Sequence, residues 1–442
     1  MPAAADTSPR GLGRRIVRIA VPAVGALAAE PLYQLADTAI VGHLGSVPLN
    51  ALGVAYGVLT PLYWLSAFLE ATTVTRIAER RGADDGAGRA PILADALRMA
   101  LVLGFALLVI VEVLARPLCW LLFARGEVLD ASVTYLRIGA LGLPLLLIAL
   151  VGHGELQGSD RTSRSLVIVV IANALNLGLE IWFVNGLGWG LRGSAFGTLI
   201  AQMTVAAMLL PRLIRGASAS RPDRGRITAT IRHGLRLATR TAMIAGTFVA
   251  ATASATRMGS TKAAAHQIGH QLFMFAALAL DALALAGQVL IAEQLGSGNR
   301  PGARAIAQRL LRVTVVGGIT IGATVAALAG VLPQLFTGEA AVDDAAFIVL
   351  ILLGVVLVPG SIAFLFDGVF LGTADYDWLV RGTAIATVVF LPIWLVTLLR
   401  PNLGLGVLWT ALIVWMTLRA IMQLVHFRSG RWLQASATAV DA

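Results

Sequence analysis

The chain has 442 residues, of which 57% are hydrophobic and 13% are charged, and its mean hydropathy is +0.81. Soluble globular proteins have about 45–50% apolar and about 25% charged residues, so these values disfavour a soluble enzyme, a disordered chain and a nucleic-acid-binding domain. In a membrane protein, the meaning of the net charge of +10 depends on where the basic residues lie along the chain. The charge therefore does not indicate a nucleic-acid partner, and none is expected.

Apolar stretches of about 20 residues, the length that crosses the hydrocarbon core as a helix, recur along the chain. Twelve windows of this kind can be placed, at 17–40, 51–73, 94–115, 132–155, 165–186, 192–211, 238–258, 263–292, 313–335, 345–371, 380–399 and 403–426. The sequence therefore predicts an all-α integral membrane protein with twelve transmembrane helices.

The basic residues are divided unevenly between the two sets of alternate loops. Most of the 34 lie on the set that includes the N-terminal segment, the loop around Arg80 and the stretch from Arg212 to Arg240. Cytoplasmic loops of membrane proteins carry the excess of Lys and Arg. We therefore expect both termini in the cytoplasm and the chain in the cell inner (cytoplasmic) membrane.

The two halves of the chain share one register. A shift of 214 residues places Gly154 on Gly368 and Gly158 on Gly372. Because each half has six predicted spans, both halves must have the same orientation, which is the parallel-repeat plan of many transporters. The predicted parts are a cytoplasmic tail, an N-lobe, a cytoplasmic linker, a C-lobe and a second tail, at 1–15, 16–214, 215–232, 233–428 and 429–442.

Polar side chains form stripes on two spans of the first half. Their spacing along a helix puts each set on one face: Glu30, Gln34 and Asp37 with Tyr33 beside them, and Asn173, Asn176 and Glu180. A charged side chain at the bilayer centre costs about 2.5–3.5 kcal/mol or more of insertion free energy. Such residues therefore indicate either a function or a role in helix packing. Hydrogen bonds that only hold helices together are one explanation. Two carboxylates favour a hydrated cavity that binds a cation.

The second half has a weaker version of this pattern. Asp281 and Gln288 lie seven residues apart on one face of their span. Asp367 lies near the end of its span, so it could either stabilise the helix end or belong to a binding site. The stretch His266–His270 is similar to a zinc-peptidase helix, but Gln267 cannot act as a general base and no third ligand is evident. No metal site, nucleotide loop or enzymatic nucleophile is therefore expected, and an ion gradient is the expected energy source.

Five segments carry a family resemblance: EPL at 30–32, DTAIVGHLG at 37–45, AAHQ at 264–267, LDALA at 280–284 and FDGVFLG at 366–372. Together they resemble the multidrug and toxic compound extrusion (MATE) family, in particular its DinF-like branch. The resemblance implies a V-shaped transporter of two six-helix bundles that exports organic cations and other amphipathic compounds in exchange for H+ or Na+.

The resemblance also implies a cation site in the N-lobe. Matching positions are Asp37 on the first helix, Asn176 and Glu180 on the fifth and Thr198 on the sixth, and the family's kink in the first helix falls on Pro22. Glu180 departs from the family's usual Asp by one methylene, which leaves its coordination geometry open.

We therefore expect a secondary multidrug antiporter that uses protons as the coupling ion, with Na+ possible and no cofactor. Its expected substrate cavity is lined by Glu30, Tyr33, Gln34, Asn173, Asp281, Gln288 and Asp367. The expected partners are drug-like small molecules and the lipid bilayer, and the expected state is a monomer. A flippase for lipid-linked precursors or polysaccharides of the same superfamily is the alternative. Such flippases usually carry cationic residues in the cavity, whereas the mid-span charges here are expected to be all acidic.

Overall fold

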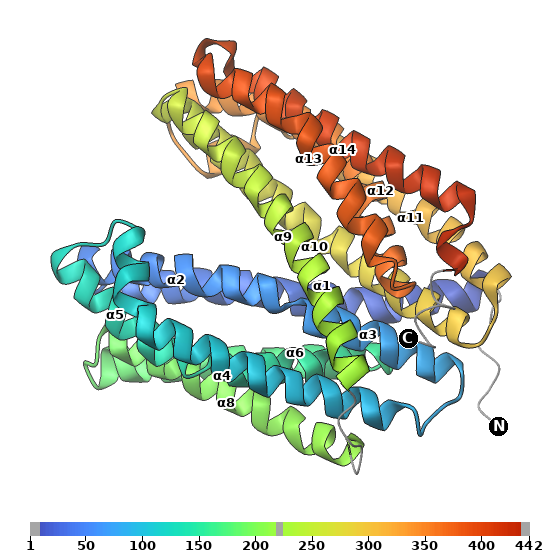
Figure 1. Cartoon of the computed structure of the whole chain (residues 1–442). Helices are drawn as coiled ribbons and strands as arrows, with labels where there is room; N and C mark the ends of the chain where they lie inside the picture. The colour runs from blue at the N-terminus through green and yellow to red at the C-terminus, as the bar shows by residue number, and fades with distance from the viewer. Residues whose placement is uncertain (1–8, 218–223, 435–442) are drawn as a thin grey trace. The chain divides into compact units, whose positions relative to one another are not determined.

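The computed structural model describes residues 9–217 and 224–434, and its secondary structure is almost entirely helical. The helices of the first half are α1 (Pro9–Gly42), α2 (Ser46–Ser66), α3 (Phe68–Gly82), α4 (Arg89–Leu121), α5 (Gly126–Ala140), α6 (Leu143–Gly158), α7 (Thr162–Ile181) and α8 (Leu191–Gly216). Those of the second half are α9 (Arg224–Arg257), α10 (Ser260–Gly296), α11 (Arg300–Ala327), α12 (Ala340–Gly372), α13 (Tyr376–Leu399) and α14 (Gly404–Ser429). Figure 1 colours the helices in chain order, from blue at the N-terminus to red at the C-terminus.

The helices are longer than the apolar windows because their polar ends continue the helical backbone. Ten helical segments among the described residues are long and apolar enough to cross a membrane, or eleven when α5 and α6, which meet at 46°, count as one span. The remaining predicted span, 238–258, lies in α9, where frequent arginine and threonine residues lower the hydropathy. The predicted all-helical membrane architecture is confirmed.

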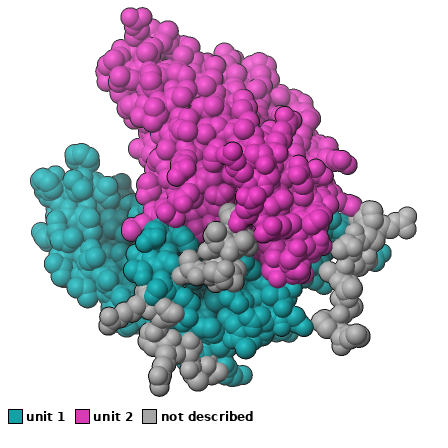
Figure 2. Space-filling model, turned by 45° about the vertical axis from the view of Figure 1, so that its right-hand side comes forward, with its two compact units in different colours: residues 1–234 teal, residues 235–442 magenta. Residues whose placement is uncertain are grey.

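The chain divides into two compact units, Met1–Gly234 and Leu235–Ala442, which Figure 2 shows in different colours. Each has its own apolar core: Leu136 and Leu147 are fully buried in the first unit, and Leu353 and Leu408 in the second. Parts of the predicted tails and linker, at 1–8, 218–223 and 435–442, lie outside the described residues, and α9 begins at Arg224, inside the predicted linker.

The internal repeat is visible in the packing of glycines. In the first unit, a Cβ on Gly154 would lie 2.8 Å from the carbonyl oxygen of Glu70, so α6 packs directly on the backbone of α3. In the second unit, Gly368 of α12 packs in the same way on the carbonyl of Ala284 in α10. The shift of 214 residues relates both partners of the contact, so the two units use one packing scheme.

The first helix runs unbroken through two prolines. Pro22 and Pro31 both lie inside α1, which pairs along its length with α7. Proline removes the backbone hydrogen bond to the residue four positions earlier, so α1 is easier to bend at these two points than the helices around it. The predicted kink at Pro22 remains a prediction.

Candidate functional site

Asp37 lies on α1 at the centre of a polar cluster in the first unit. Its side chain is fully buried. Ser194 of α8 donates a hydrogen bond to its Oδ1 at 2.6 Å, and the hydroxyl of Tyr56 on α2 donates one to its Oδ2. Three helices therefore hold one carboxyl group inside the bundle, and both of its oxygens have a donor.

Glu180 brings a second carboxyl group to this cluster. It lies on α7, is fully buried, and has Tyr33, Asp37 and Ser194 as electrostatic neighbours. Within the described part of the chain, neither oxygen of Glu180 has a hydrogen-bond partner of regular geometry, and the same is true of Oδ1 of Asn176 one turn earlier. Glu180, next to Asp37, and Asn176 thus provide three oxygens on α7 that are available to a cation or a proton.

Helix α8 completes the cluster because it approaches α7 closely. Gly197 makes this possible, since a Cβ there would lie 3.2 Å from Oδ1 of Asn176 and 3.3 Å from the backbone nitrogen of Glu180. One residue later, Thr198 Oγ1 lies 2.9 Å from the hydroxyl oxygen of Tyr33. All four residues of the predicted coupling site, Asp37, Asn176, Glu180 and Thr198, thus lie on the three helices that meet here.

The other polar residues of the two stripes have different surroundings. The amide nitrogen of Gln34 donates to Glu30 at 3.1 Å, and Glu30 is exposed on the surface of the unit. Asn173 donates to the backbone carbonyl of Ala29 at 3.0 Å, which ties α7 to α1. This bond between helices is the packing role that the sequence left as an alternative for such residues. The predicted cavity roles of these three residues remain predictions.

The second unit contains a buried ionic network that sequence reasoning missed. Asp367 accepts hydrogen bonds from Arg240 of α9, from Arg419 of α14 at 2.9 Å and from Gln423 at 2.7 Å. The side chain of Arg419 is 3% exposed. The expectation that mid-span charges are all acidic was therefore wrong. Arg419 falls inside the predicted span 403–426, and this position in the sequence could have indicated a basic residue within the bundle.

The other two predicted cavity residues of the second half, Asp281 and Gln288, lie on α10. Asp281 is exposed on the unit, and Arg240, Asp367 and Arg419 are its electrostatic neighbours. Gln288 is buried seven residues further on. Since Asp367 is bound by two arginines, it belongs to an ion-pair network rather than to a helix end. No cluster of three or more metal-ligating side chains is found in the ranges 9–217 and 224–434.

Comparison with known proteins then identifies the family. The MatE family model matches the chain twice, at residues 22–182 and 237–396. The chain belongs to the MATE family. The double match also confirms the predicted internal repeat.

Relatives of this MATE chain occur in plants and bacteria. It is 30% identical to protein DETOXIFICATION 44, chloroplastic, of Arabidopsis thaliana, over 95% of this chain and 84% of that protein. It is 27% identical to DNA damage-inducible protein F of Escherichia coli strain K12, over 95% and 93% of the two chains. The predicted similarity to the DinF branch is thus confirmed.

Solved structures agree with the fold. A crystal structure described as MATE in the bent conformation matches 97% of each chain with a TM-score of 0.88 at 21% sequence identity. The chain is therefore a multi-pass membrane protein of a family of multidrug and toxic compound efflux transporters, and its relatives are transporters rather than enzymes.

Proposed function

We propose that this MATE chain is a secondary antiporter that exports small amphipathic and cationic compounds in exchange for protons, with Asp37 and Glu180 binding the exchanged proton. One observation carries the proposal. Two fully buried carboxyl groups lie next to each other, and among the described residues neither forms an ion pair. Two adjacent buried carboxylates cannot both stay charged without a cation, so this pair favours binding one proton between them.

The two carboxyl groups have different roles in this proposal. Asp37 is held by donors from Ser194 and Tyr56, which fix its position between α1, α2 and α8. Glu180 has no such donors of regular geometry in the described residues, so its oxygens are open to a proton or to the positively charged part of a substrate. A change of charge at Asp37 acts on α1, whose two prolines make it the helix most easily bent.

A proton is favoured over Na+ as the coupling ion because of the oxygen count. A sodium site needs several hard oxygen ligands that converge on one small ion. Both oxygens of Asp37 already accept hydrogen bonds, which leaves Asn176 and Glu180 as the main donors for a metal ion. No organic or metal cofactor takes part in the proposed cycle, because the coupling ion alone supplies the energy.

The alternative of a flippase for anionic lipid-linked precursors needs free positive charge in a cavity. Arg419 is buried and Arg240 is partly buried in the second unit, and both are bound to Asp367. Asp367 compensates one of these two positive charges, and Asp281 is a further acidic neighbour of both arginines. In the first unit, by contrast, the buried carboxyl groups of Asp37 and Glu180 have no basic partner among the described residues. This distribution favours cationic and neutral substrates.

The proposed setting follows from the same features. The chain acts in the cell inner (cytoplasmic) membrane with both termini in the cytoplasm, as a monomer whose partners are drug-like molecules and lipid. The excess of arginine on one set of loops supports this orientation.

The test uses inverted membrane vesicles with an imposed pH gradient in sodium-free buffer. Adding ethidium should collapse the gradient with wild-type protein but not with Asp37→Asn at equal protein levels. Asp130→Asn is the matched control, because Asp130 pairs with Arg116 on the exposed surface and its side chain is 68% exposed. Ethidium transport that requires Na+ and moves no protons would overturn the choice of ion, and full activity of Asp37→Asn would overturn the site.

A second pair of variants separates charge from packing at Glu180. Glu180→Gln removes the titratable group and should uncouple ethidium export from proton movement, whereas Glu180→Asp restores the family's residue and should retain most of the coupling. Equal activity of Glu180→Gln and wild type would mean that Glu180 only holds helices together.

A further inference from the structure

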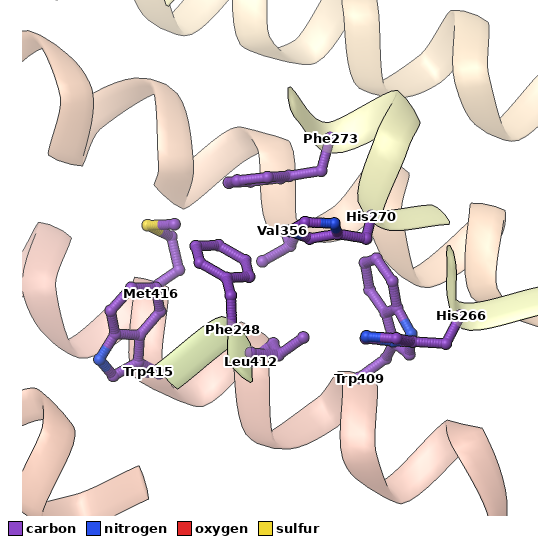
Figure 3. A pocket seen from close by; sticks show the side chains of 9 residues that line it. All are labelled: Phe248, His266, His270, Phe273, Val356, Trp409, Leu412, Trp415 and Met416. Carbon is purple, nitrogen blue, oxygen red and sulfur yellow. The ribbon is translucent and has the colours of Figure 1, made fainter. Parts of the chain in front are cut away.

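An aromatic pocket lies within the second unit, next to the ionic network. Arg419 of that network lies 4.9 Å from the ring centroid of Trp415 and donates to the sulfur of Met416 at 3.6 Å, on the outer side of the pocket wall. Four helices, α9, α10, α12 and α14, contribute the nine side chains that line it, as Figure 3 shows: Phe248, His266, His270, Phe273, Val356, Trp409, Leu412, Trp415 and Met416. No carboxylate, lysine or arginine is among these described residues. The pocket is therefore an uncharged, mostly aromatic environment.

The rings of the pocket contact one another around Phe248. Its ring centroid lies 5.2 Å from those of His270 and Phe273 and 5.9 Å from that of Trp415. Phe248 and His270 are only partly buried, whereas the other lining residues are buried. These two side chains therefore form the mouth. The free space between the walls holds about one water-sized group, so a ring enters only when Phe248 turns aside.

Hydrogen bonds at the inner end assign the protonation of His266. Thr252 uses its single hydroxyl hydrogen to donate to the backbone carbonyl of Phe248 at 3.0 Å. Its oxygen lies 3.2 Å from Nε2 of His266 and must therefore accept a hydrogen from it. With Nε2 protonated, Nδ1 of the neutral imidazole is an acceptor, and His266 is 1% exposed.

This acceptor has no partner inside the protein. In the part of the chain that the structure describes, Nδ1 of His266, Nε2 of His270 and Nε1 of Trp409 make no hydrogen bond. The ring of His266 lies 5.8 Å from that of Trp409 and 6.2 Å from that of His270, so the three nitrogens belong to neighbouring rings of one pocket. A buried polar group without a partner is costly, and a ligand that supplies the missing hydrogen bonds removes that cost.

We infer that this pocket is a binding site for a neutral aromatic molecule that carries a hydroxyl or N–H group. The aromatic ring stacks among Phe248, Phe273 and Trp415, since flat π-systems pack favourably against one another. The hydroxyl or N–H group donates to Nδ1 of His266, and the oxygen of a hydroxyl group can in addition accept from Nε1–H of Trp409. The lack of charged lining residues selects a neutral ligand, in contrast to the acidic site of the first unit.

The test compares two probes of the same shape that differ in one hydrogen-bonding group. Full-length protein in lipid nanodiscs is titrated by calorimetry with 1-naphthol and with 1-methylnaphthalene, and the heats of empty nanodiscs are subtracted. Wild-type protein should bind one 1-naphthol per chain, at least tenfold more tightly than 1-methylnaphthalene. No saturable binding of 1-naphthol above that of empty nanodiscs would overturn the inference.

Two variants locate the binding. His266→Phe keeps a ring of similar size but removes Nδ1, and Trp409→Phe removes the N–H donor; each should reduce the preference for 1-naphthol to less than threefold. His43→Phe is the matched control, because His43 is exposed in the turn that follows α1 and lies in the other unit. A preference that survives both pocket variants, or that His43→Phe also abolishes, would refute the assignment.

This site does not depend on the proposed proton coupling, and one further variant keeps the two claims apart. Asp37→Asn should bind 1-naphthol as wild type does even though its ethidium export is lost. Loss of 1-naphthol binding in Asp37→Asn would show that the naphthol site is not the pocket of the second unit.

Discussion

The side-chain oxygen of Ser194 lies 2.6 Å from Oδ1 of Asp37, and 157 residues separate the two along the chain. This bond predicts that Ser194 positions the carboxyl group that we propose binds the exchanged proton. Ser194→Ala leaves a buried oxygen of Asp37 without its donor, which costs about 1–3 kcal/mol. We expect the rate of substrate-driven pH-gradient collapse in inverted vesicles to fall roughly tenfold, the factor that about 1.4 kcal/mol produces.

The control for this change is another buried serine. Ser132 is fully buried on α5, but its hydroxyl donates only to the carbonyl of Val128 in its own helix, at 2.6 Å. Ser132→Ala should therefore retain activity close to wild type, and Ser194→Thr, which keeps a hydroxyl, should recover part of the lost rate. Equal rates for Ser194→Ala and Ser132→Ala would contradict the positioning role.

Gly197 leads to a second prediction, about the distance between α7 and α8. An alanine there would place its Cβ 3.2 Å from Oδ1 of Asn176 and 3.3 Å from the backbone nitrogen of Glu180, closer than ordinary contact. Gly197→Ala should therefore displace these two residues and reduce ethidium efflux by a factor of about ten or more, since misplacing groups at a site is costly even by about 1 Å.

Gly178 provides the comparison for Gly197, because it lies on α7 itself and a Cβ there would meet nothing within 4 Å. Gly178→Ala should keep efflux and raise helix stability slightly, as alanine favours helices over glycine by about 1 kcal/mol. Drug susceptibility of cells that express each variant, measured at matched membrane levels, distinguishes them. Similar efflux by both variants would show that the approach of α8 does not control the site.

The helical architecture and the internal repeat could be predicted from the sequence because both depend on local patterns of residues. The register that relates Gly154 to Gly368 is also the register in which these glycines pack, on Glu70 and Ala284 respectively. A small residue recurring at one shift in two halves is visible without a structure. Asp37, Asn176 and Glu180 could be proposed from the sequence because they belong to stripes of polar residues inside apolar helices, whereas Thr198 was proposed from the family resemblance.

The contacts between helices could not be predicted in the same way. Ser194 and Tyr56 donate to Asp37 from α8 and α2, but a serine or tyrosine inside a span is too common to indicate a role. The pairing of Asp367 with Arg240 and Arg419 depends on which faces of α9, α12 and α14 meet. Periodicity along one helix does not contain that information.

Membrane orientation is a prediction that can be checked without any transport assay. The excess of arginine on alternate loops predicts that reporters fused after Gly225 and Gly298 remain cytoplasmic, whereas reporters near Gly126 and Gly338 are exported. A pair of alkaline phosphatase and green fluorescent protein fusions at each position gives opposite signals on the two sides. A cytoplasmic signal at Gly338 would mean that α9, the least apolar of the predicted spans, does not cross the membrane.

The ionic network around Asp367 leads to the last prediction, which concerns stability. Asp367→Asn removes the carboxylate that forms the ion pair with Arg419, whose side chain is 3% exposed. Removing one partner of a buried pair costs about 3–5 kcal/mol, because the other charge stays buried and uncompensated. The unfolding temperature of the purified protein should therefore fall by several degrees.

Asp377 offers a close comparison for Asp367, since it also pairs with an arginine of α9. Arg236 lies 2.9 Å from its Oδ1, but the side chain of Asp377 is 52% exposed, and exposed pairs contribute only about 0–1 kcal/mol. Asp377→Asn should therefore shift the unfolding temperature much less than Asp367→Asn. Combining Asp367→Asn with Arg419→Gln removes the uncompensated charge and should recover part of the loss. The unfolding temperatures are measured by differential scanning fluorimetry in one detergent. Equal shifts for Asp367→Asn and Asp377→Asn would show that burial does not determine how much these ion pairs contribute to stability.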